Sequence, residues 1–129
     1  MKKTYLLFLC LFSVLSAFAQ APDENRFVKT VLVEKLDEPM VMAYLPDGKI
    51  LMIERKGDIK QFDPSAKELK TLAHVNVNTK YTNRVGVVRE AEEGLMGLAL
   101  DPKFKENHWL YLYYAHPTEH KHVLVRAEM

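Results

Sequence analysis

Two short runs of consecutive apolar residues limit the possible folds of this chain more than any other feature. Ile50, Leu51, Met52 and Ile53 follow one another without a polar residue, and residues 109–114 read Trp-Leu-Tyr-Leu-Tyr-Tyr. Successive side chains of a strand point to opposite faces, so both faces of each run are apolar. Each of these strands therefore has to be covered from two sides, which predicts sheets stacked on sheets.

The rest of the chain is divided into short runs rich in β-branched and aromatic residues, separated by turn residues, which is typical of an all-β protein. Pro46, Asp47 and Gly48 predict a tight hairpin turn, because proline fixes φ and glycine can adopt a positive φ. The residue types at 55–58 predict a second such turn. The predicted strands are residues 27–33, 40–45, 50–54, 59–63, 69–75, 95–100, 109–115 and 123–126.

One predicted strand alternates in the way expected of a half-buried strand. Its residues at every second position are predicted to share one face of the sheet: Leu69, Thr71, Ala73, Val75 and Val77. Two segments have a helix as the alternative to a strand or loop. One begins at Ser65, a residue type that caps helices, and the other covers residues 89–93, which are good helix formers.

A weak internal repeat suggests how the strands are grouped. Residues 40–47 align with residues 95–102 at a spacing of 55, and each segment is followed by an apolar strand and a further turn. A repeat of about 50 residues with four strands in each unit is typical of propeller blades. We therefore predict a partial β-propeller of about one and three-quarter blades of four-stranded antiparallel sheet. The remaining run, 27–33, is predicted to pair with the last blade of the ring, and a closed ring needs roughly four to eight blades.

The N-terminal residues have the pattern of a secretory signal peptide. Lys2 and Lys3 precede an apolar run at 5–15, and Ala17-Phe18-Ala19 supplies the small residues of a cleavage site before Gln20. The apolar run is shorter than the roughly 20 residues that span a bilayer. We expect residues 1–19 to be removed, residues 20–129 to stay out of the membrane, and the product to be periplasmic or secreted; a retained N-terminal anchor is the alternative.

Composition excludes several classes of site in the mature chain. The single cysteine, Cys10, lies inside the apolar run of the signal, so no disulfide, thiolate metal site or cysteine nucleophile is expected after cleavage. Residues 20–129 carry sixteen basic and seventeen acidic side chains, and no basic stripe is present. Nucleic acid is therefore not an expected partner.

Several segments resemble the pyrroloquinoline-quinone (PQQ) dependent sugar dehydrogenases of the soluble glucose dehydrogenase and glucose/sorbosone dehydrogenase type. The resemblance is carried by residues 38–40, 45–50 and 53–59, and above all by residues 92–104, which read Glu-Glu-Gly-Leu-Met-Gly-Leu-Ala-Leu-Asp-Pro-Lys-Phe. It continues through Asn107 into the aromatic strand at 109–114 and covers nearly all of the mature chain.

The resemblance implies a six-bladed propeller that holds PQQ over its central channel and oxidises the C1 hydroxyl of a sugar, with calcium activating the cofactor. In that family the histidine base, its aspartate and the basic groups that bind PQQ lie further along the chain than this sequence extends, so no catalytic, PQQ or calcium ligand is assigned here. One position does map: Glu92 stands where soluble glucose dehydrogenase has a glutamine that faces the sugar. The difference leaves the identity of the sugar open.

The loops at one end of a propeller share a face, and here the loops 55–57, 76–93 and 116–121 are expected to cluster as the substrate face. The long polar loop 76–93 contains the two candidate substrate-binding residues, Glu92 and Glu93, and long loops in compact folds are often functional. The other interpretation of both is a solvated acid.

Two further sets of residues have alternative interpretations. Arg55 is expected either to reach an acidic cofactor or, as we favour, to pair on the surface with Glu54 or Asp58. His116, His120 and His122 are common metal-ligand types, but their spacing matches no zinc motif, which favours solvated histidines.

The leading hypothesis is the N-terminal part of an exported quinoprotein sugar dehydrogenase, inactive without the missing blades. The alternatives are a non-catalytic secreted propeller that binds glycan or protein, and an interrupted gene product without a role.

Overall fold

The computed structural model describes residues 26–129, so the predicted signal peptide and the cleavage site before Gln20 lie outside the described residues. The chain divides into two units, Met1–Thr30 and Val31–Met129. Residues 27–33 contain no strand, and Phe27 and Val28 are exposed, so the strand predicted there is wrong. A strand needs a pairing partner, and none of the described strands pairs with this segment.

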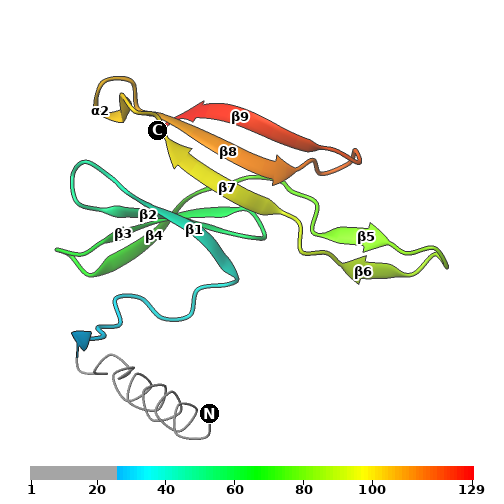
Figure 1. Cartoon of the computed structure of the whole chain (residues 1–129), viewed down its shortest axis with the longest axis horizontal. Helices are drawn as coiled ribbons and strands as arrows, with labels where there is room; N and C mark the ends of the chain where they lie inside the picture. The colour runs from blue at the N-terminus through cyan, green and yellow to red at the C-terminus, as the bar shows by residue number, and fades with distance from the viewer. Residues whose placement is uncertain (1–25) are drawn as a thin grey trace, which may run out of the picture. The chain divides into compact units, whose positions relative to one another are not determined.

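The first sheet of the second unit is a four-stranded antiparallel meander (Figure 1). It consists of β1 (Pro39–Tyr44), β2 (Ile50–Glu54), β3 (Asp58–Asp63) and β4 (Glu68–His74), each paired with the next. All four predicted strands are confirmed, with ends that differ by at most one residue. The predicted turn between β1 and β2 is also confirmed, since Gly48 has a φ of 86° and its amide donates to the Leu45 carbonyl.

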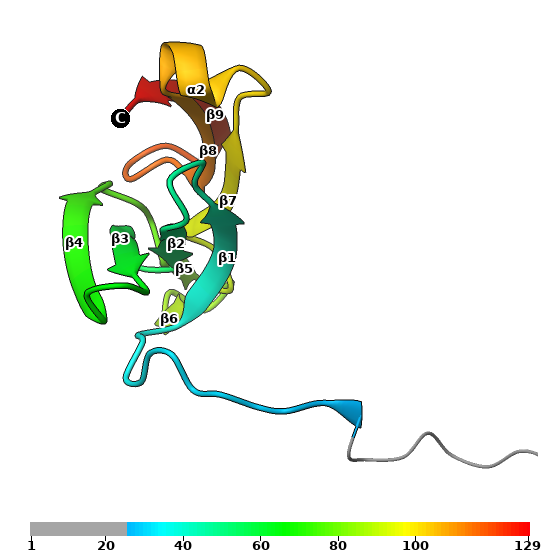
Figure 2. The ribbon, with the colours of Figure 1, turned by 90° about the vertical axis from the view of Figure 1, so that its left-hand side faces the viewer.

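The second sheet contains β7 (Leu95–Leu100), β8 (Trp109–Ala115) and β9 (His122–Glu128), again in antiparallel order. A single helical turn, α2 (Phe104–Asn107), connects β7 to β8. Strand β7 contacts β1 and β2, and Figure 2 shows it beside these strands. The predicted arrangement of one complete blade followed by most of a second is therefore present.

The segment 76–93, predicted to be a loop, contains a small hairpin of β5 (Lys80–Thr82) and β6 (Val88–Glu90). Both helical alternatives are wrong, because β6 occupies part of 89–93 and a turn followed by β4 occupies the region after Ser65. The hairpin tip is closed by Asn83, whose side-chain oxygen accepts hydrogen bonds from the amides of Val85 and Val87. A three-residue strand carries too little periodicity to be found from the sequence.

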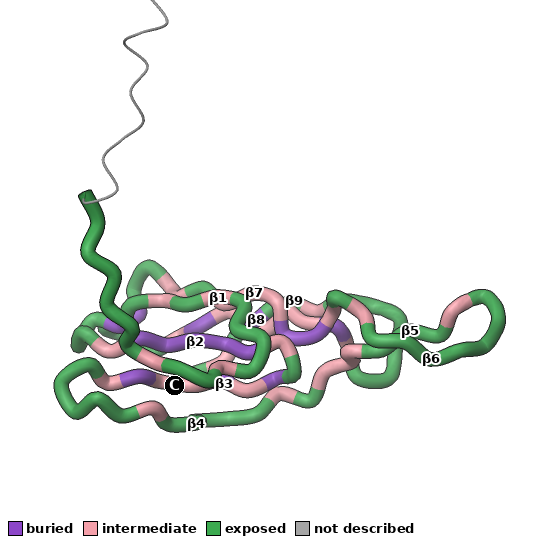
Figure 3. Tube along the Cα trace, turned by 90° about the horizontal axis from the view of Figure 1, so that it is seen from below, coloured by how far each residue is buried: buried purple, intermediate pink, exposed green. Residues whose placement is uncertain are grey.

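The core lies on both faces of β2, in which every residue is buried (Figure 3). On one face, Leu51 and Ile53 pack with Leu95, Leu110 and Leu112 of the second sheet. On the other face, a smaller cluster forms around β2, and its buried members are Ile50, Met52 and Phe62. The predicted coverage of this strand from two sides is confirmed.

Strand β8 behaves differently. Its Leu110 and Leu112 are buried, whereas Tyr113 on the other face is 42% exposed. That face is covered by side chains of its own sheet: the Arg126 guanidinium lies 3.8 Å from the Trp109 ring centre, and His122 stacks on Tyr113. The predicted second covering layer over β8 is absent among the described residues.

The prediction that every second residue from Leu69 to Val77 shares one face of the sheet is also wrong. Ile59 pairs with Ala73 and Lys60 pairs with Thr71, so Leu72 is an extra residue in the register. Such a bulge moves the following side chains to the other face of the sheet. Accordingly Leu69 packs on the cluster around Ile50, whereas Val75 and Val77 pack on the main core.

Among the residues that the structure describes, no helix has the length and apolar character needed to cross a bilayer.

Candidate functional site

The three loops predicted to cluster do meet at one end of the two sheets. The Leu95 amide donates to the Arg55 carbonyl at 2.8 Å, and the Ala115 amide donates to the Gly94 carbonyl at 2.9 Å. The Asn78 amide in turn donates to the Ala115 carbonyl at 3.2 Å. Backbone hydrogen bonds therefore tie the turn after β2, the segment before β7 and the end of β8 into one surface, which we call the loop face.

Arg55 lies at the centre of the loop face, with only 12% of its side chain exposed. Its Nε donates to Glu38 Oε2 at 2.6 Å, and its Nη2 lies 3.5 Å from Glu90 Oε2. Its Nη1 donates to the carbonyls of Ala91 and Glu93 at 2.7 and 3.1 Å. The hydrogen bond with Glu38 lowers the pKa of that carboxyl and raises the pKa of Arg55.

The favoured prediction for Arg55, a surface pair with Glu54 or Asp58, is therefore wrong. Glu54 points away and is 2% exposed; its Oε2 pairs with Lys60 Nζ at 2.7 Å and its Oε1 accepts from the Asp37 amide at 2.8 Å. Alternation explains the difference, because β2 directs consecutive side chains to opposite faces. No local pattern predicts the two acidic partners of Arg55, Glu38 and Glu90, because they lie far from it in the chain.

The two predicted substrate residues lie on the loop face but line different hollows. Glu92 is exposed and lines a hollow of about 450 Å³ together with Glu38, Met40, Arg55 and Glu90. Glu93 is half-buried and lines a second hollow of about 190 Å³ with Asn78 and residues of the β8–β9 connection. Three carboxylates, those of Glu38, Glu90 and Glu92, line the larger hollow and can accept hydrogen bonds from hydroxyl groups.

The three histidines of the β8–β9 connection line the smaller hollow. His116 Nδ1 accepts a hydrogen bond from the Glu119 amide at 3.1 Å, and its Nε2 lies 3.5 Å from Glu119 Oε1. The His122 ring stacks on the ring of Tyr113, with ring centres 5.5 Å apart. Within residues 26–129, no group of three or more His, Cys, Asp or Glu side chains has the geometry to hold a metal ion.

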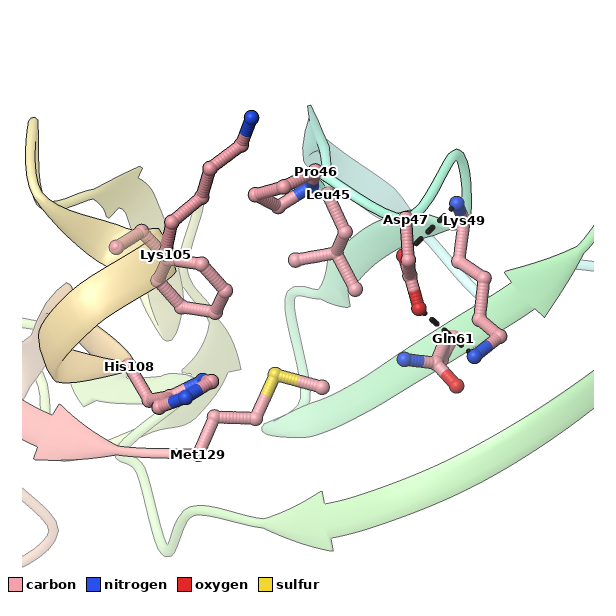
Figure 4. A pocket seen from close by; sticks show the side chains of 9 residues that line it. Leu45, Pro46, Asp47, Lys49, Gln61, Lys105, His108 and Met129 are labelled. Carbon is pink, nitrogen blue, oxygen red and sulfur yellow. Dashed lines mark hydrogen bonds and ion pairs between the residues drawn. The ribbon is translucent and has the colours of Figure 1, made fainter.

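A third hollow, of about 440 Å³, lies at the opposite end of the strands, between the β1–β2 turn and α2 (Figure 4). Leu45, Pro46 and Met129 give it an apolar lining, and the Asp47–Lys49 ion pair at 2.8 Å lies at its edge. None of the predicted site residues lines it.

The last part of the motif at 92–104, Asp-Pro-Lys-Phe, together with Asn107, closes the β7–β8 connection. Asp101 accepts hydrogen bonds from the Tyr111 hydroxyl at 2.7 Å, the Asn107 amide group at 3.0 Å and the Lys103 backbone amide at 2.8 Å. These bonds, led by that of Tyr111, lower the pKa of Asp101. Asn107 also accepts from the Trp109 amide at 2.9 Å. This part of the motif stabilises the connection and lies away from the loop face.

Comparison with known proteins identifies the family. The Glucose / Sorbosone dehydrogenase family model matches residues 36–129, most of the chain. The chain belongs to the glucose/sorbosone dehydrogenase family. The predicted resemblance is thereby confirmed.

Two relatives with sequence identities of 31% or more are found among curated proteins. Quinoprotein glucose dehydrogenase B of Acinetobacter calcoaceticus is 33% identical over 100 residues, which are 75% of this chain and 19% of that protein. An uncharacterized protein of Synechocystis is 31% identical over 88 residues, 68% of this chain and 21% of that protein. This member of the glucose/sorbosone dehydrogenase family thus spans about a fifth of the curated relatives it matches.

Solved structures of dehydrogenases are also similar to this chain. A putative oxidoreductase (glucose dehydrogenase) of Thermus thermophilus is 33% identical with a TM-score of 0.57, covering 70% of this chain and 24% of that one. The PQQ-bound aldose sugar dehydrogenase of Streptomyces coelicolor is 25% identical with a TM-score of 0.63, covering 78% and 27%. The fold is therefore all-β and part of a β-propeller, as predicted.

Arg55, the residue that the sequence offered as a contact for an acidic cofactor, has most of its donors engaged within the protein. PQQ carries three carboxylates and needs cationic groups with free donors, whereas the guanidinium of Arg55 is engaged by two carboxylates and two carbonyls.

Proposed function

We propose that this chain forms the first blades of an exported, PQQ-dependent enzyme that oxidises an aldose or a related sugar alcohol group. The observation that carries the proposal is the family match over residues 36–129, supported by 33% identity to a quinoprotein glucose dehydrogenase. PQQ, when bound, would accept the hydride of the C1 alcohol, and calcium would activate the cofactor. Both would be held by parts of the protein other than residues 26–129.

Within that enzyme, the proposed role of these blades is to build one side of the substrate face. Glu92 and Glu93 would accept hydrogen bonds from sugar hydroxyl groups, since ionised carboxylates are acceptors only. Because Glu92 and Glu93 line different hollows, each would contact a different part of the substrate. The larger hollow, with Glu92, has the greater room for a sugar ring.

Residues 20–129 alone are proposed to be inactive, because the family resemblance implies that the histidine base and the PQQ ligands lie outside them. Residues 1–19 are proposed to direct export to the periplasm or the cell exterior. The comparisons do not favour a non-catalytic glycan or protein binder, since the matched relatives with a stated activity are dehydrogenases.

The test is dye reduction by the complete gene product with PQQ and calcium, using a panel of aldoses and sugar alcohols. Turnover with at least one sugar is expected, and residues 20–129 assayed in parallel are expected to show none. Binding of a glycan without turnover of any sugar would contradict the proposal and support the binder. Dye reduction by residues 20–129 alone would contradict the proposed location of the cofactor site.

A further inference from the structure

The segment 90–93, which carries both candidate substrate residues, has little regular structure to hold it in place. It begins with Glu90, the last residue of β6, and is separated from β7 by Gly94. The Ala91 amide donates to the Thr79 carbonyl at 2.8 Å, and Leu95 is tied to Arg55. Between these two backbone anchors stand Glu92 and Glu93.

One side chain bonds the backbone of this segment on both sides of Glu92. Arg55 Nη1 donates to the Ala91 carbonyl at 2.7 Å and to the Glu93 carbonyl at 3.1 Å. The same guanidinium is oriented by Glu38 at Nε and by Glu90 at Nη2. A planar guanidinium has five N–H donors in a rigid fork, so one side chain can serve all four acceptors at once.

The exposed fractions of these side chains agree with an Arg55 guanidinium that is held in one orientation. The Arg55 side chain is 12% exposed, whereas its partners Glu38 and Glu90 are 44% and 61% exposed. Arg55 also lines the larger hollow, but its donors point at the protein and not at a ligand. Glu92 lines the same hollow, and no ion pair to its carboxylate is present among the described residues.

We propose that Arg55 is a positioning residue of the sugar site: it holds segment 90–93 so that Glu92 faces the larger hollow and Glu93 the smaller one. The inference rests on the proposed function, in which these carboxylates contact the sugar. In this proposal Arg55 does not bind the substrate through its Nε and Nη1 donors, because Glu38 and the carbonyls of Ala91 and Glu93 already accept from them. Its effect on the substrate is exerted through the carbonyls of Ala91 and Glu93.

The test compares three variants of the complete gene product: Arg55→Gln, Arg55→Lys and, as the matched control, Lys56→Gln. Lys56 is the neighbouring cation, and among residues 26–129 its Nζ pairs with the exposed carboxylate of Asp37 alone. Two measurements are made on each: hydrogen exchange of the amides of residues 90–95, and KM and kcat for the best aldose with PQQ and calcium.

Arg55→Lys keeps the charge but replaces the fork with a single ammonium group, so it is expected to retain a pair with Glu38 and lose both carbonyl bonds. We expect exchange in residues 90–95 to accelerate about tenfold or more, and KM to rise about tenfold with kcat changed by less than about twofold. Arg55→Gln is expected to show the same pattern more strongly. Lys56→Gln is expected to match the unmodified protein in both measurements.

Unchanged exchange and unchanged KM in Arg55→Lys would overturn the inference. A lower kcat at unchanged KM would also overturn it, because that result indicates a smaller folded fraction and not a displaced substrate contact. If the unmodified protein oxidises no sugar, the proposed function fails, and the exchange measurement still decides whether Arg55 holds the segment.

Discussion

The backbone carbonyl of Arg55 occupies the space that a β-carbon of residue 94 would need, and this close approach to Gly94 joins the two sheets at the loop face. The Leu95 amide donates to that carbonyl at 2.8 Å, and Gly94 has a φ of 138°. A β-carbon at Gly94 would collide with the carbonyl oxygen and backbone carbon of Arg55. The first blade and the second therefore approach as closely as they do because residue 94 has no side chain.

Gly94→Ala is expected to destabilise the protein by about 3 kcal/mol, because both the backbone conformation and the backbone contact would be strained. Chemical denaturation of the complete gene product measures the change. Gly48→Ala is the matched control: Gly48 also has a positive φ, of 86°, but a β-carbon there meets nothing within 4 Å. The control is expected to cost about 1 kcal/mol. Equal losses in the two variants would contradict the steric argument.

Glu54→Ala is expected to cost about 3 kcal/mol, because it removes the acceptor of the Asp37 amide and leaves the Lys60 ammonium, 16% exposed, with only the more distant carboxylate of Asp58 at 4.0 Å. Replacing both members of the pair, as in Glu54→Leu with Lys60→Met, is expected to recover much of that loss. Chemical denaturation measures the free energy of unfolding of the single and the double variant. The exposed pair of Glu68 and Lys70 supplies the control, and Lys70→Ala is expected to change stability by less than about 0.5 kcal/mol.

Asp101 is expected to make the fold sensitive to acid. Its pKa in the folded state is lowered from an ordinary value of 3.8, chiefly by the Tyr111 hydroxyl. A carboxyl whose pKa is lowered by folding stabilises the fold fully above its ordinary pKa and loses that contribution as the pH falls through the lower, folded value. The difference in unfolding free energy between the unmodified protein and Asp101→Asn should therefore be constant at neutral pH and shrink below about pH 4.

The same argument predicts a direct measurement on the carboxyl. Tyr111→Phe removes the donor that contributes most, so the pKa of Asp101, followed by NMR titration, should rise toward its ordinary value. No change in that pKa would show that the hydroxyl does not stabilise the charged form.

Glu92→Gln is expected to change the preference among sugars, because it replaces an acceptor-only group with one that also donates. The ratio of kcat/KM between the best aldose and its epimers should shift by about tenfold. Glu106→Gln, on α2 at the other end of the strands, is the control and should leave the ratio unchanged. If Glu92→Gln leaves every ratio unchanged, Glu92 is a solvated acid.

Residues 20–129 produced alone are expected to associate. Met42 and Tyr44 of β1 are 60% and 69% exposed and lie beside the buried cluster of Ile50, Met52 and Phe62, so an apolar sheet face is open to solvent. Light scattering should show a mass that increases with concentration, and Met42→Lys should reduce it. A monomer with a sharp, cooperative thermal transition would contradict this expectation.

Strand positions were the part of the fold that local pattern could predict. The bounds predicted for β2, β7 and β8 are those observed, because uninterrupted apolar runs between turn residues mark both ends of such strands. The clustering of the three loops was also predictable, since it follows from strand order and blade topology once the strands are placed. The family resemblance required a motif, residues 92–104, whose Asp101 proves to have a structural role.

The partners of each side chain were decided only by the tertiary structure. Arg55 was expected to pair with Glu54 or Asp58, yet its acceptors come from before β1 and from the segment before β7, at sequence separations that carry no local signal. The alternating residues from Leu69 onward do not share one face, because Leu72 forms a bulge in the pairing of β4 with β3. Sequence thus determined where the backbone extends and turns, because those preferences are local. Pairing, register and the choice of ionic partner depend on which distant segments packing brings together, and that information lies in no single segment.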